Sequence, residues 1–386
     1  MKTATTKTEG RAGIWVMQPG GFRAFSPKPL PPNPPLLVDE ELQSKLALAE
    51  RNLGRLDSIS SFVPDPDRFV TMYVRQEAVL SSQIEGTQAS LAELLEYQAS
   101  EGTETRTDDL GEVVNYLKAL RTGLQRLEEL PVSSRLLSEV HKVLMSGTRG
   151  GDASKTPGEF RRSQNWIGGT GPADARYVPP PAHEMSQAMS DLEKFLNNSK
   201  STPLLIEIGL AHAQFETIHP FLDGNGRLGR LMITFLLKAR KALSEPLLYL
   251  SHFFKVNRNE YYDRLQAVRT DGDWEGWINF FLTAVAHVAE EAAARAKAII
   301  ALLEYDRIYL RLKLGRRSGM ALDLLDVLME QPIITSQLAR ERLGKSQPTI
   351  DQLLSDLVGL GLLHETTGRK RGRRFSYKSY LALFGA

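Results

Sequence analysis

The chain has 386 residues, of which 42% are hydrophobic and 24% charged, with no cysteine and a formal net charge of +2. This length allows two or three domains, and the lack of cysteine excludes disulfides, thiolate nucleophiles and Cys-based metal sites. The amino-terminal residues lack the apolar segment of a signal peptide and no apolar run is long enough to span a membrane, so we expect a cytoplasmic protein without a membrane partner.

Glycine and proline dominate the first part of the chain, residues 1–38. The proline run over 27–35 cannot hold a regular helix or a central strand, which predicts an extended strap on the surface of the following domain. After it the spacing of apolar residues becomes helical, and a second helix is predicted over about 66–81. Residues 39–110 are therefore predicted to form an N-terminal helical region.

A serine and a glutamate stand four residues apart where this second helix ends. Ser81 and Glu85 would lie on one helical face, and Gly86 is suited to stop the helix. Taken alone, such a pair is typical of a solvated helix end.

Two further helices are predicted between about residues 110 and 145, with Ser133 or Ser134 as the N-cap of the second. Residues 158–181 then indicate two short extended arms around a glycine-rich turn. The edge of such a hairpin can pair with an extended target segment and hold its hydroxyl over an active site. A hairpin of this kind is equally often a part that only closes the fold.

The densest chemistry of the chain lies in residues 218–230, Ile-His-Pro-Phe-Leu-Asp-Gly-Asn-Gly-Arg-Leu-Gly-Arg. A helix precedes this segment, Pro220 disfavours helical geometry at His219, and a second helix is predicted to start near Gly226. Gly224 and Gly226 let the backbone turn tightly and leave amide N–H groups pointing out of the new helix. The segment therefore predicts an anion site.

Four side chains around this turn suit phosphate chemistry. Arg227 and Arg230 can clamp phosphate oxygens, and Asp223 is an oxygen ligand for a Mg²⁺ that carries phosphates. His219 is the nearby side chain able to take a proton at neutral pH. The pattern indicates phosphoryl-type transfer from a nucleotide, whereas the bland alternative is a plain turn with solvated arginines.

Further helices are predicted over 182–197, in two pieces around 247–265, and from about 274 to 311. His212 is expected to be a satisfied helix residue, not a second base. The remaining histidines lack ligand spacing, and no zinc site is predicted.

Beyond about Gly315 the pattern changes to three helices in a helix-turn-helix organisation. The tract 368–374 then carries five cations and no acid before a short strand, which is typical of a winged helix whose basic wing meets DNA phosphates. Winged helices also serve as protein-contact or dimer modules, and Asp351 and Asp356 disfavour deep insertion of the third helix into a groove. DNA is a candidate partner through residues 335–377.

Residues 219–230 resemble the signature of the Fic family, His-x-Phe-x-(Asp/Glu)-Gly-Asn-Gly-Arg-x-x-Arg, and match it at every specified position. The resemblance covers most of the chain, from about residue 19 to 381. Together with the winged-helix pattern, it predicts a mainly α fold. A multi-helix Fic core over 111–314 would carry a small β-hairpin flap, and a winged helix-turn-helix domain would occupy 315–386.

Fic proteins mostly transfer AMP from ATP to a protein hydroxyl. The resemblance therefore implies a protein adenylyltransferase that acts on a Tyr, Thr or Ser of a target protein, and on itself. Aromatic residues at helical spacing more often belong to a hydrophobic core than to a ligand site. The adenine-binding role that follows therefore has a structural role as its alternative. The resemblance assigns proton abstraction to His219, Mg²⁺ to Asp223, phosphate binding to Gly224, Asn225, Gly226, Arg227 and Arg230, and adenine binding to Tyr261, Tyr262 and Asn257.

The family also includes an inhibitory helix with the pattern (Ser/Thr)-x-x-x-Glu-(Gly/Asn), which Ser81-x-x-x-Glu85-Gly86 resembles. A bidentate pair between Glu85 and Arg230 would remove that arginine from the γ-phosphate and leave the α-phosphate misaligned. Fic proteins carry a target-positioning flap ahead of the signature, and the resemblance implies this role for residues 158–181.

Several alternatives stay open at this point. Gly226 stands where phosphate-transferring relatives carry lysine, which favours AMP over bare phosphate. The same residues could also remove AMP from a protein, with Glu85 positioning a water. An ATP-sensing DNA-binding regulator is the alternative from another class, and a homodimer would allow Glu85 to act on a neighbouring chain.

Overall fold

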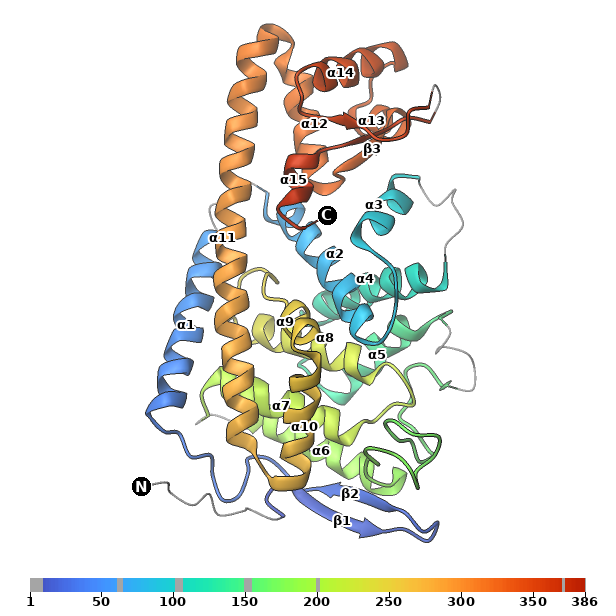
Figure 1. Ribbon diagram of the computed structural model, residues 1–386, viewed down its shortest axis with the longest axis vertical. Coiled ribbons are helices and arrows are strands. Elements are labelled where there is room, and N and C mark those ends of the chain that lie inside the picture. Colours follow the sequence, from blue (N-terminus) through green and yellow to red (C-terminus); the bar gives the residue numbers. More distant parts are fainter. Residues whose placement is uncertain are drawn as a thin grey trace.

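The computed structural model describes residues 10–60, 65–100, 107–148, 155–198, 202–369 and 372–385. Helices dominate it, so the predicted mainly α class is confirmed (Figure 1). In the described ranges no helix combines the length and apolar character needed to cross a bilayer. The α-helices are α1 (Glu40–Ser60), α2 (Pro66–Ile84), α3 (Leu91–Ala99), α4 (Asp108–Arg126), α5 (Ser134–Met145), α6 (Ala182–Asn198), α7 (Leu204–Ile218), α8 (Asn225–Ala239), α9 (Ser251–Val256), α10 (Arg258–Asp271), α11 (Trp274–Leu314), α12 (Ser318–Glu330), α13 (Ser336–Leu343), α14 (Gln347–Gly359) and α15 (Lys378–Ala382).

The described part of the segment predicted to be an extended strap contains a β-hairpin. β1 (Gly13–Met17) and β2 (Arg23–Pro27) pair antiparallel, and the Phe25 N–H donates to the carbonyl of Val178 at 2.9 Å. Upstream, Arg11 pairs with Glu275 of α11 at 2.7 Å. The amino-terminal segment is thus fastened to the elements around the later signature segment.

Helix α11 runs through most of the length of the molecule (Figure 1). Its 41 residues correspond to roughly 60 Å of helix. Along its first half lies α1, whose Asn52 amide donates to the carbonyl of Ala286 at 3.0 Å. Farther along, Asp306 accepts a hydrogen bond from the hydroxyl of Tyr377 at 2.5 Å. α11 therefore connects the helical core with the C-terminal elements.

Helices α7 and α8 form the buried centre of the core. From Leu205 onward every residue of α7 is buried, because apolar residues occur on all its sides and its polar residues, such as His212 and Glu216, are buried with them. α8 is buried from Asn225 to Leu237, apart from Gly226. The Trp277 indole N–H of α11 donates to the carbonyl of Gly209 at 2.8 Å. The loop between α7 and α8 is consequently held at both ends by packed helices.

The C-terminal elements combine α12, α13 and α14 with a three-stranded sheet in the order β3 (Ile333–Thr335), β5 (Arg374–Ser376), β4 (His364–Glu365). The three helices agree with those expected from the sequence. Residues 370 and 371 of the basic tract lie outside the described residues. Arg374 turns toward the protein and pairs with Glu96 of α3 at 3.3 Å.

Two details differ from the sequence prediction. Helix α3 was not predicted, although Ser90 and Glu93 form a capping box at its start. The two arms of residues 158–181 are joined, among the described residues, by a single isolated bridge between Ile167 and Tyr177. This segment is therefore mostly irregular, and other contacts must hold it in place.

Candidate active site

A cavity of about 640 Å³ lies where the loop between α7 and α8 meets α10 and the segment 166–177. Charged and aromatic side chains from five separate parts of the sequence line it. Of the predicted site residues it brings together Glu85, His219, Asp223, Gly224, Asn225, Gly226, Arg227, Arg230, Tyr261 and Tyr262.

Residues of the segment 158–181, which comes before α6 and α7 in the chain, fix the signature loop. His219 ends α7 with a positive φ of 50°, a conformation that a non-glycine residue keeps only when its surroundings hold it there. The buried Arg161 donates from Nε to the carbonyl of His219 at 2.9 Å. Asn165 donates from Nδ2 to the same carbonyl at 3.2 Å and to that of Phe221 at 2.9 Å. These bonds determine where the imidazole of His219 lies.

Two more side chains tie the loop to itself and to α5. The Asn225 amide accepts from the Phe221 N–H at 2.9 Å and donates to the Phe221 carbonyl at 2.8 Å. His141 stacks on Phe221, with ring centroids 3.8 Å apart, and its Nε2 lies 2.9 Å from the carbonyl of Asp223. The Asn225 side chain, predicted to bind phosphate, is thus engaged in shaping the loop.

His219 is neutral at physiological pH. Burial, together with the nearby guanidiniums of Arg269 and Arg161, lowers the pKa of His219 to about 3. A neutral imidazole can accept a proton, and an anionic ligand beside it would raise its pKa. The ring is therefore in the protonation state that a general base requires.

The N-terminus of α8 is occupied by a carboxylate of the same chain. Gly224 precedes the helix with a φ of +74°, and a Cβ there would come within 2.6 Å of Met145 Sδ. A Cβ at Gly226 would lie 2.3 Å from Oε1 of Glu85. Both glycines are needed for the close approach, and Glu85 sits where an anion would meet the helix N-terminus.

Glu85 is held there by Arg230. The guanidinium of Arg230 donates to Glu85 Oε1 at 2.7 Å, to Ser81 Oγ at 2.8 Å and to the Ser81 carbonyl at 2.9 Å. Burial raises the pKa of Glu85, but the charge and hydrogen bond of Arg230, with Arg227 and His219, outweigh it, so the net pKa is lowered. The pair is therefore ionised at neutral pH, although a third of the Glu85 side chain is exposed.

Arg227 has a different partner. It is buried, and its Nη1 lies 3.0 Å from Oε2 of Glu112 on α4. Its Nη2 lies 3.8 Å from Oδ1 of Asp223. Asp223 is more exposed and lies 3.6 Å from Lys155. Any phosphate entering the cavity would have to compete with these internal carboxylates for both arginines.

Two further carboxylates lie buried near Arg230. Burial raises the pKa of Glu216 to about 7, and its Oε1 has no hydrogen-bond partner among the described residues. Burial likewise raises the pKa of Glu77 to about 7, although Ser251, Arg230 and Tyr116 act in the opposite direction. Arg230 is thus surrounded by three acids, of which Glu85 alone contacts it directly.

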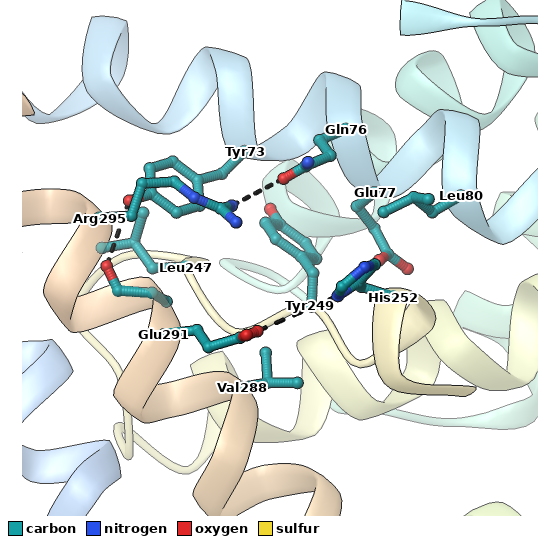
Figure 2. A pocket seen from close by; sticks show the side chains of 11 residues that line it. Tyr73, Gln76, Glu77, Leu80, Leu247, Tyr249, His252, Val288, Glu291 and Arg295 are labelled. Atoms are coloured by element: carbon teal, nitrogen blue, oxygen red, sulfur yellow. Dashed lines mark hydrogen bonds and ion pairs between the residues drawn. The ribbon is translucent and has the colours of Figure 1, made fainter. Parts of the chain in front are cut away.

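Behind Glu77 lies a small cavity of about 30 Å³ between α2, α9 and α11 (Figure 2). Tyr249 and His252 face it, and Arg295 closes one side by donating to Gln76 at 2.7 Å. Oε2 of Glu77 and the hydroxyl of Tyr249 are buried there without a partner among the described residues. The cavity has room for about one water, which suits these two polar groups.

The predicted adenine residues fall into different places. Tyr261 is buried, stacks on Phe254 with centroids 4.5 Å apart, and shares a hydrogen bond of 2.9 Å with His212, so it belongs to the core as well as to the cavity wall. Tyr262 is half-buried and lines the cavity. The amide of Asn257 donates to the carbonyl of Phe253 at 3.0 Å, away from the residues that line the cavity.

Asn259 takes the place expected for Asn257 in the cavity wall. The two positions differ by two residues, or more than half a helical turn, and Asn257 immediately precedes the first residue of α10. The structure therefore places Asn259, and not Asn257, in the cavity wall.

Sequence reasoning did not identify the residues that hold the loop. Arg161, Asn165 and His141 act from segments far from the signature, and Glu112 comes from α4. One signal in the sequence could have pointed to them: the segment that contains Arg161 and Asn165 is otherwise rich in turn-forming residues, yet it carries these charged and amide side chains. His212 satisfies both ring nitrogens, with Gly229 at 3.1 Å and Tyr261, as the sequence interpretation expected.

The comparisons with known proteins agree with this geometry. The model of the "Fic/DOC family N-terminal" region matches residues 43–125, and the "Fic/DOC family" model matches residues 131–237. A solved Fic family protein from Desulfovibrio desulfuricans G20 superposes with a TM-score of 0.57 at 21% identity, covering 89% of this chain and 97% of that one. A Fic domain containing signaling protein from Bacteroides thetaiotaomicron gives a TM-score of 0.52 at 18% identity, covering 65% and 97%.

Among curated sequences, protein adenylyltransferase Fic of Aedes aegypti is 38% identical over 126 residues, 32% of this chain and 22% of that protein. A probable protein adenylyltransferase of Aquifex aeolicus is 26% identical over 179 residues, 44% of this chain and 50% of that protein. The chain therefore spans between about a fifth and a half of the length of these relatives.

Fold and site together define a helical protein whose signature loop faces a cavity lined by several arginines. With the two family matches inside the same helical core, the chain belongs to the Fic/DOC family.

Proposed function

We propose that the protein transfers AMP from ATP to a Tyr, Thr or Ser hydroxyl of a target protein, and to itself. The observation that carries this proposal is the placement of a neutral His219 and a cationic helix N-terminus in one cavity. The names of the relatives, protein adenylyltransferases, support it. A cavity of about 640 Å³ also has the size of a small-molecule site.

In the proposed reaction the target hydroxyl oxygen attacks the α-phosphorus of ATP. His219 takes the hydroxyl proton, the bond from the α-phosphorus to the bridging oxygen breaks, and pyrophosphate leaves. Arg227 and Arg230 stabilise the charge on the departing phosphates, and the α8 N-terminus binds the negative oxygens. Tyr262 and Asn259 lie in the cavity wall where they could contact the adenine.

Asp223 fits a Mg²⁺ that arrives with the nucleotide. Its carboxylate is partly exposed at the cavity, and among the described residues it is not part of a cluster of three or more metal-ligating side chains. One carboxylate plus substrate phosphates is a usual Mg²⁺ environment. The ion would neutralise phosphate charge during transfer.

We propose that Glu85 inhibits the enzyme in this arrangement. Its carboxylate occupies the space above Gly226 and holds Arg230, so the terminal phosphate of ATP would lack both. A nucleotide bound without Arg230 would present its α-phosphate out of line, and such misplacement is costly in rate. Release of Glu85 then activates transfer.

The segment 158–181 is proposed to position the target. It carries the exposed Trp166 and the wall residues Ile167 and Tyr177 at the cavity. Arg161 and Asn165 fix its first arm to the signature loop, so a target chain held by this segment would be placed relative to His219.

A second candidate function is an ATP-sensing DNA-binding regulator, which the C-terminal elements favour. α13 and α14 join through a tight turn at Gly344, and Arg340 and Lys345 are exposed there. We propose that these elements form a winged helix. Arg317 pairs with Asp356 at 3.3 Å, which neutralises one of the acids on α14 that would repel DNA.

The position of the label distinguishes these functions. A Glu85→Gly variant should incorporate label from ATP marked at the α-phosphate and none from ATP marked at the γ-phosphate, and Glu85→Gly with His219→Ala should incorporate neither. Label from the γ-phosphate alone would show kinase activity. Loss of AMP from a modified target with the unaltered chain would show removal, and DNA retardation without incorporation would favour the regulator.

A further inference from the structure

The second half of α11 exposes apolar residues at a coiled-coil spacing. Tyr305, Ile308 and Leu312 are 65%, 57% and 78% exposed, which is unusual for such side chains. Three exposed alanines continue the same line toward the middle of the helix. The intervals along the line are 4, 3, 4, 3 and 4 residues, as in the a and d positions of a heptad, for Ala294, Ala298, Ala301, Tyr305, Ile308 and Leu312.

This exposed stripe, residues 294–312, lies on the side of α11 opposite the face that packs against the rest of the protein. The buried positions of the same half are Ala296, Ile299, Leu303, Asp306 and Leu310, and they face the protein's own body. Figure 1 shows α1 ending about halfway along α11 and the C-terminal elements lying on one side of its upper half. The helix is thus anchored on one face, while the described parts of the chain leave the stripe exposed.

We propose that the stripe is the interface of a homodimer, in which the second halves of α11 from two copies pack antiparallel about a two-fold axis. Six positions at heptad spacing span about 18 residues, or roughly 27 Å, which is long enough for several layers of knobs-into-holes packing. A second copy is the occupant that automatically presents the same heptad spacing, and two-fold symmetry makes the surface self-complementary.

The charges beside the stripe select the antiparallel direction and its register. Glu304 and Arg311 are exposed and occupy g positions, which face each other across an antiparallel pair. When Tyr305 packs against Ile308 of the partner subunit, Ala301 packs against Leu312 of the partner subunit. Glu304 then lies beside Arg311 of the partner subunit, and symmetry forms this ion pair twice.

Other arrangements lose these pairs. A shift of one heptad in one direction places Glu304 beside Glu304 of the partner subunit, and Lys297 beside Arg311 of the partner subunit. A shift of one heptad in the opposite direction places the two Arg311 side chains of the dimer beside each other. Like charges in these positions are unfavourable. In a parallel pair the g positions face e positions, where Leu302 and Tyr309 stand, so no ion pair forms.

Because the chain has no cysteine, cross-linking can test the geometry directly. We would mix an Ala301→Cys chain with an affinity-tagged Leu312→Cys chain and oxidise the mixture. The expected product is a mixed disulfide dimer, whereas Leu312→Cys alone should stay uncross-linked. Efficient self-cross-linking of Leu312→Cys would overturn the antiparallel assignment, and absence of the mixed dimer would overturn the register.

Light scattering on the unaltered chain tests the association itself. We expect the mass of two copies, and of one copy for Ile308→Glu with its helix content unchanged. Glu304→Arg and Arg311→Glu should each raise the dimer dissociation constant roughly tenfold, and combining them should restore it, because exposed ion pairs contribute modestly but with a definite sign. A monomer at every concentration reached, or a dimer indifferent to Ile308→Glu, would exclude this interface.

Discussion

Two segments meet in the cavity and are held in very different ways. The signature loop, residues 218–224, is fixed by Arg161, Asn165, Asn225 and His141 from several elements. The end of α2 contributes Glu85, which is held by Arg230 and remains one-third exposed. The loop is therefore built to stay in one conformation. The end of α2 is itself packed, but the Glu85 side chain is attached through its pair with Arg230 and can leave.

Gly86 strengthens this contrast. It follows Glu85 with a φ of +103°, and a Cβ built there would meet nothing within 4 Å. Among the described residues the turn is therefore open on that side, and the Glu85 side chain can leave Arg230 while its neighbours Ile84 and Thr87 stay buried. An element that controls activity is expected to come from such weakly held parts of a fold.

Removing the weakly held contact should have the largest effect on rate. Glu85→Gly frees Arg230 and the α8 N-terminus, and we expect the rate of AMP incorporation to rise by about 10²-fold, the order of magnitude that misplacement of reacting groups can cost. The initial rate of incorporation measures this. Glu85→Gln keeps the shape but loses the charge and should give an intermediate rise, and Glu128→Gly, far from the site, should leave the rate unchanged. A rate unaffected by Glu85→Gly would show that the carboxylate does not restrain the enzyme.

Breaking the firmly held segment should instead affect stability and activity together. Arg161→Leu removes the side-chain donor to the carbonyls of Ile218 and Pro180 and leaves the His219 carbonyl with Asn165 alone, and we expect a loss of about 3 kcal/mol in unfolding free energy. Chemical denaturation measures it, and activity of the Glu85→Gly background should fall with it. Arg162→Leu is the matched control, because that neighbouring side chain is 86% exposed and pairs only with Glu159 in the described ranges. Equal losses for the two variants would contradict the structural role of Arg161.

The comparison also explains what the sequence could and could not predict. The buried helices α7 and α8 and the turn at Gly224 follow from apolar spacing and from glycine and proline chemistry. The pairing of Glu85 with Arg230 was expected from the family pattern as a bidentate pair, and the structure contains it through one contact from Nη2 to Oε1, because Nε of Arg230 donates to Ser81. The bonds from Arg161 to the loop join segments about 60 residues apart, and no local pattern specifies such contacts.

Smaller errors have equally local causes. α3 has a capping box that the apolar spacing alone did not bring out. Asn257 and Asn259 stand on either side of the first residue of α10, and only the rotation of the helix relative to the cavity, which the sequence does not specify, places Asn259 in the wall. The stripe on α11 has a heptad pattern in the sequence, but only the structure shows that these positions, and not those facing the protein's body, are exposed.

The buried acids behind Arg230 should give a pH dependence of stability. Because the pKa of Glu77 in the folded chain is about 7, above its ordinary value of 4.5, the folded state binds more protons than the unfolded state between these values. Stability therefore falls as pH rises from about 4.5 to 7, by as much as about 3 kcal/mol for a full shift. Arg230, Tyr116, Ser251 and the cavity residue Tyr249 surround this group.

Glu77→Gln should flatten this slope, as measured by unfolding at pH 5 and pH 8. Glu216 has the same direction of shift and should retain part of the slope, so the double variant with Glu216→Gln should be flatter still. Glu128→Gln is the exposed control. A slope that is unchanged in both buried variants would show that these carboxylates are ionised in the folded protein.

The smallest effect is expected at the proposed adenine end of the cavity. Tyr262→Ala removes a wall residue and should raise the KM for ATP roughly tenfold, the order of one stacking contact. Asn257→Ala should stay within about twofold, because its amide donates to the Phe253 carbonyl of the preceding helix α9 and does not line the cavity. Steady-state kinetics in the Glu85→Gly background compare the two. A larger effect from Asn257 would reverse the assignment.

The most direct test is a crystal structure of Glu85→Gly with a non-hydrolysable ATP analogue and Mg²⁺. The terminal phosphate should contact Arg230, the other phosphates should lie at the N-terminus of α8, and the α-phosphorus should face Nε2 of His219 across the space for a hydroxyl. An analogue bound outside this cavity, or Arg230 still turned to Ser81 with the phosphates elsewhere, would contradict the account.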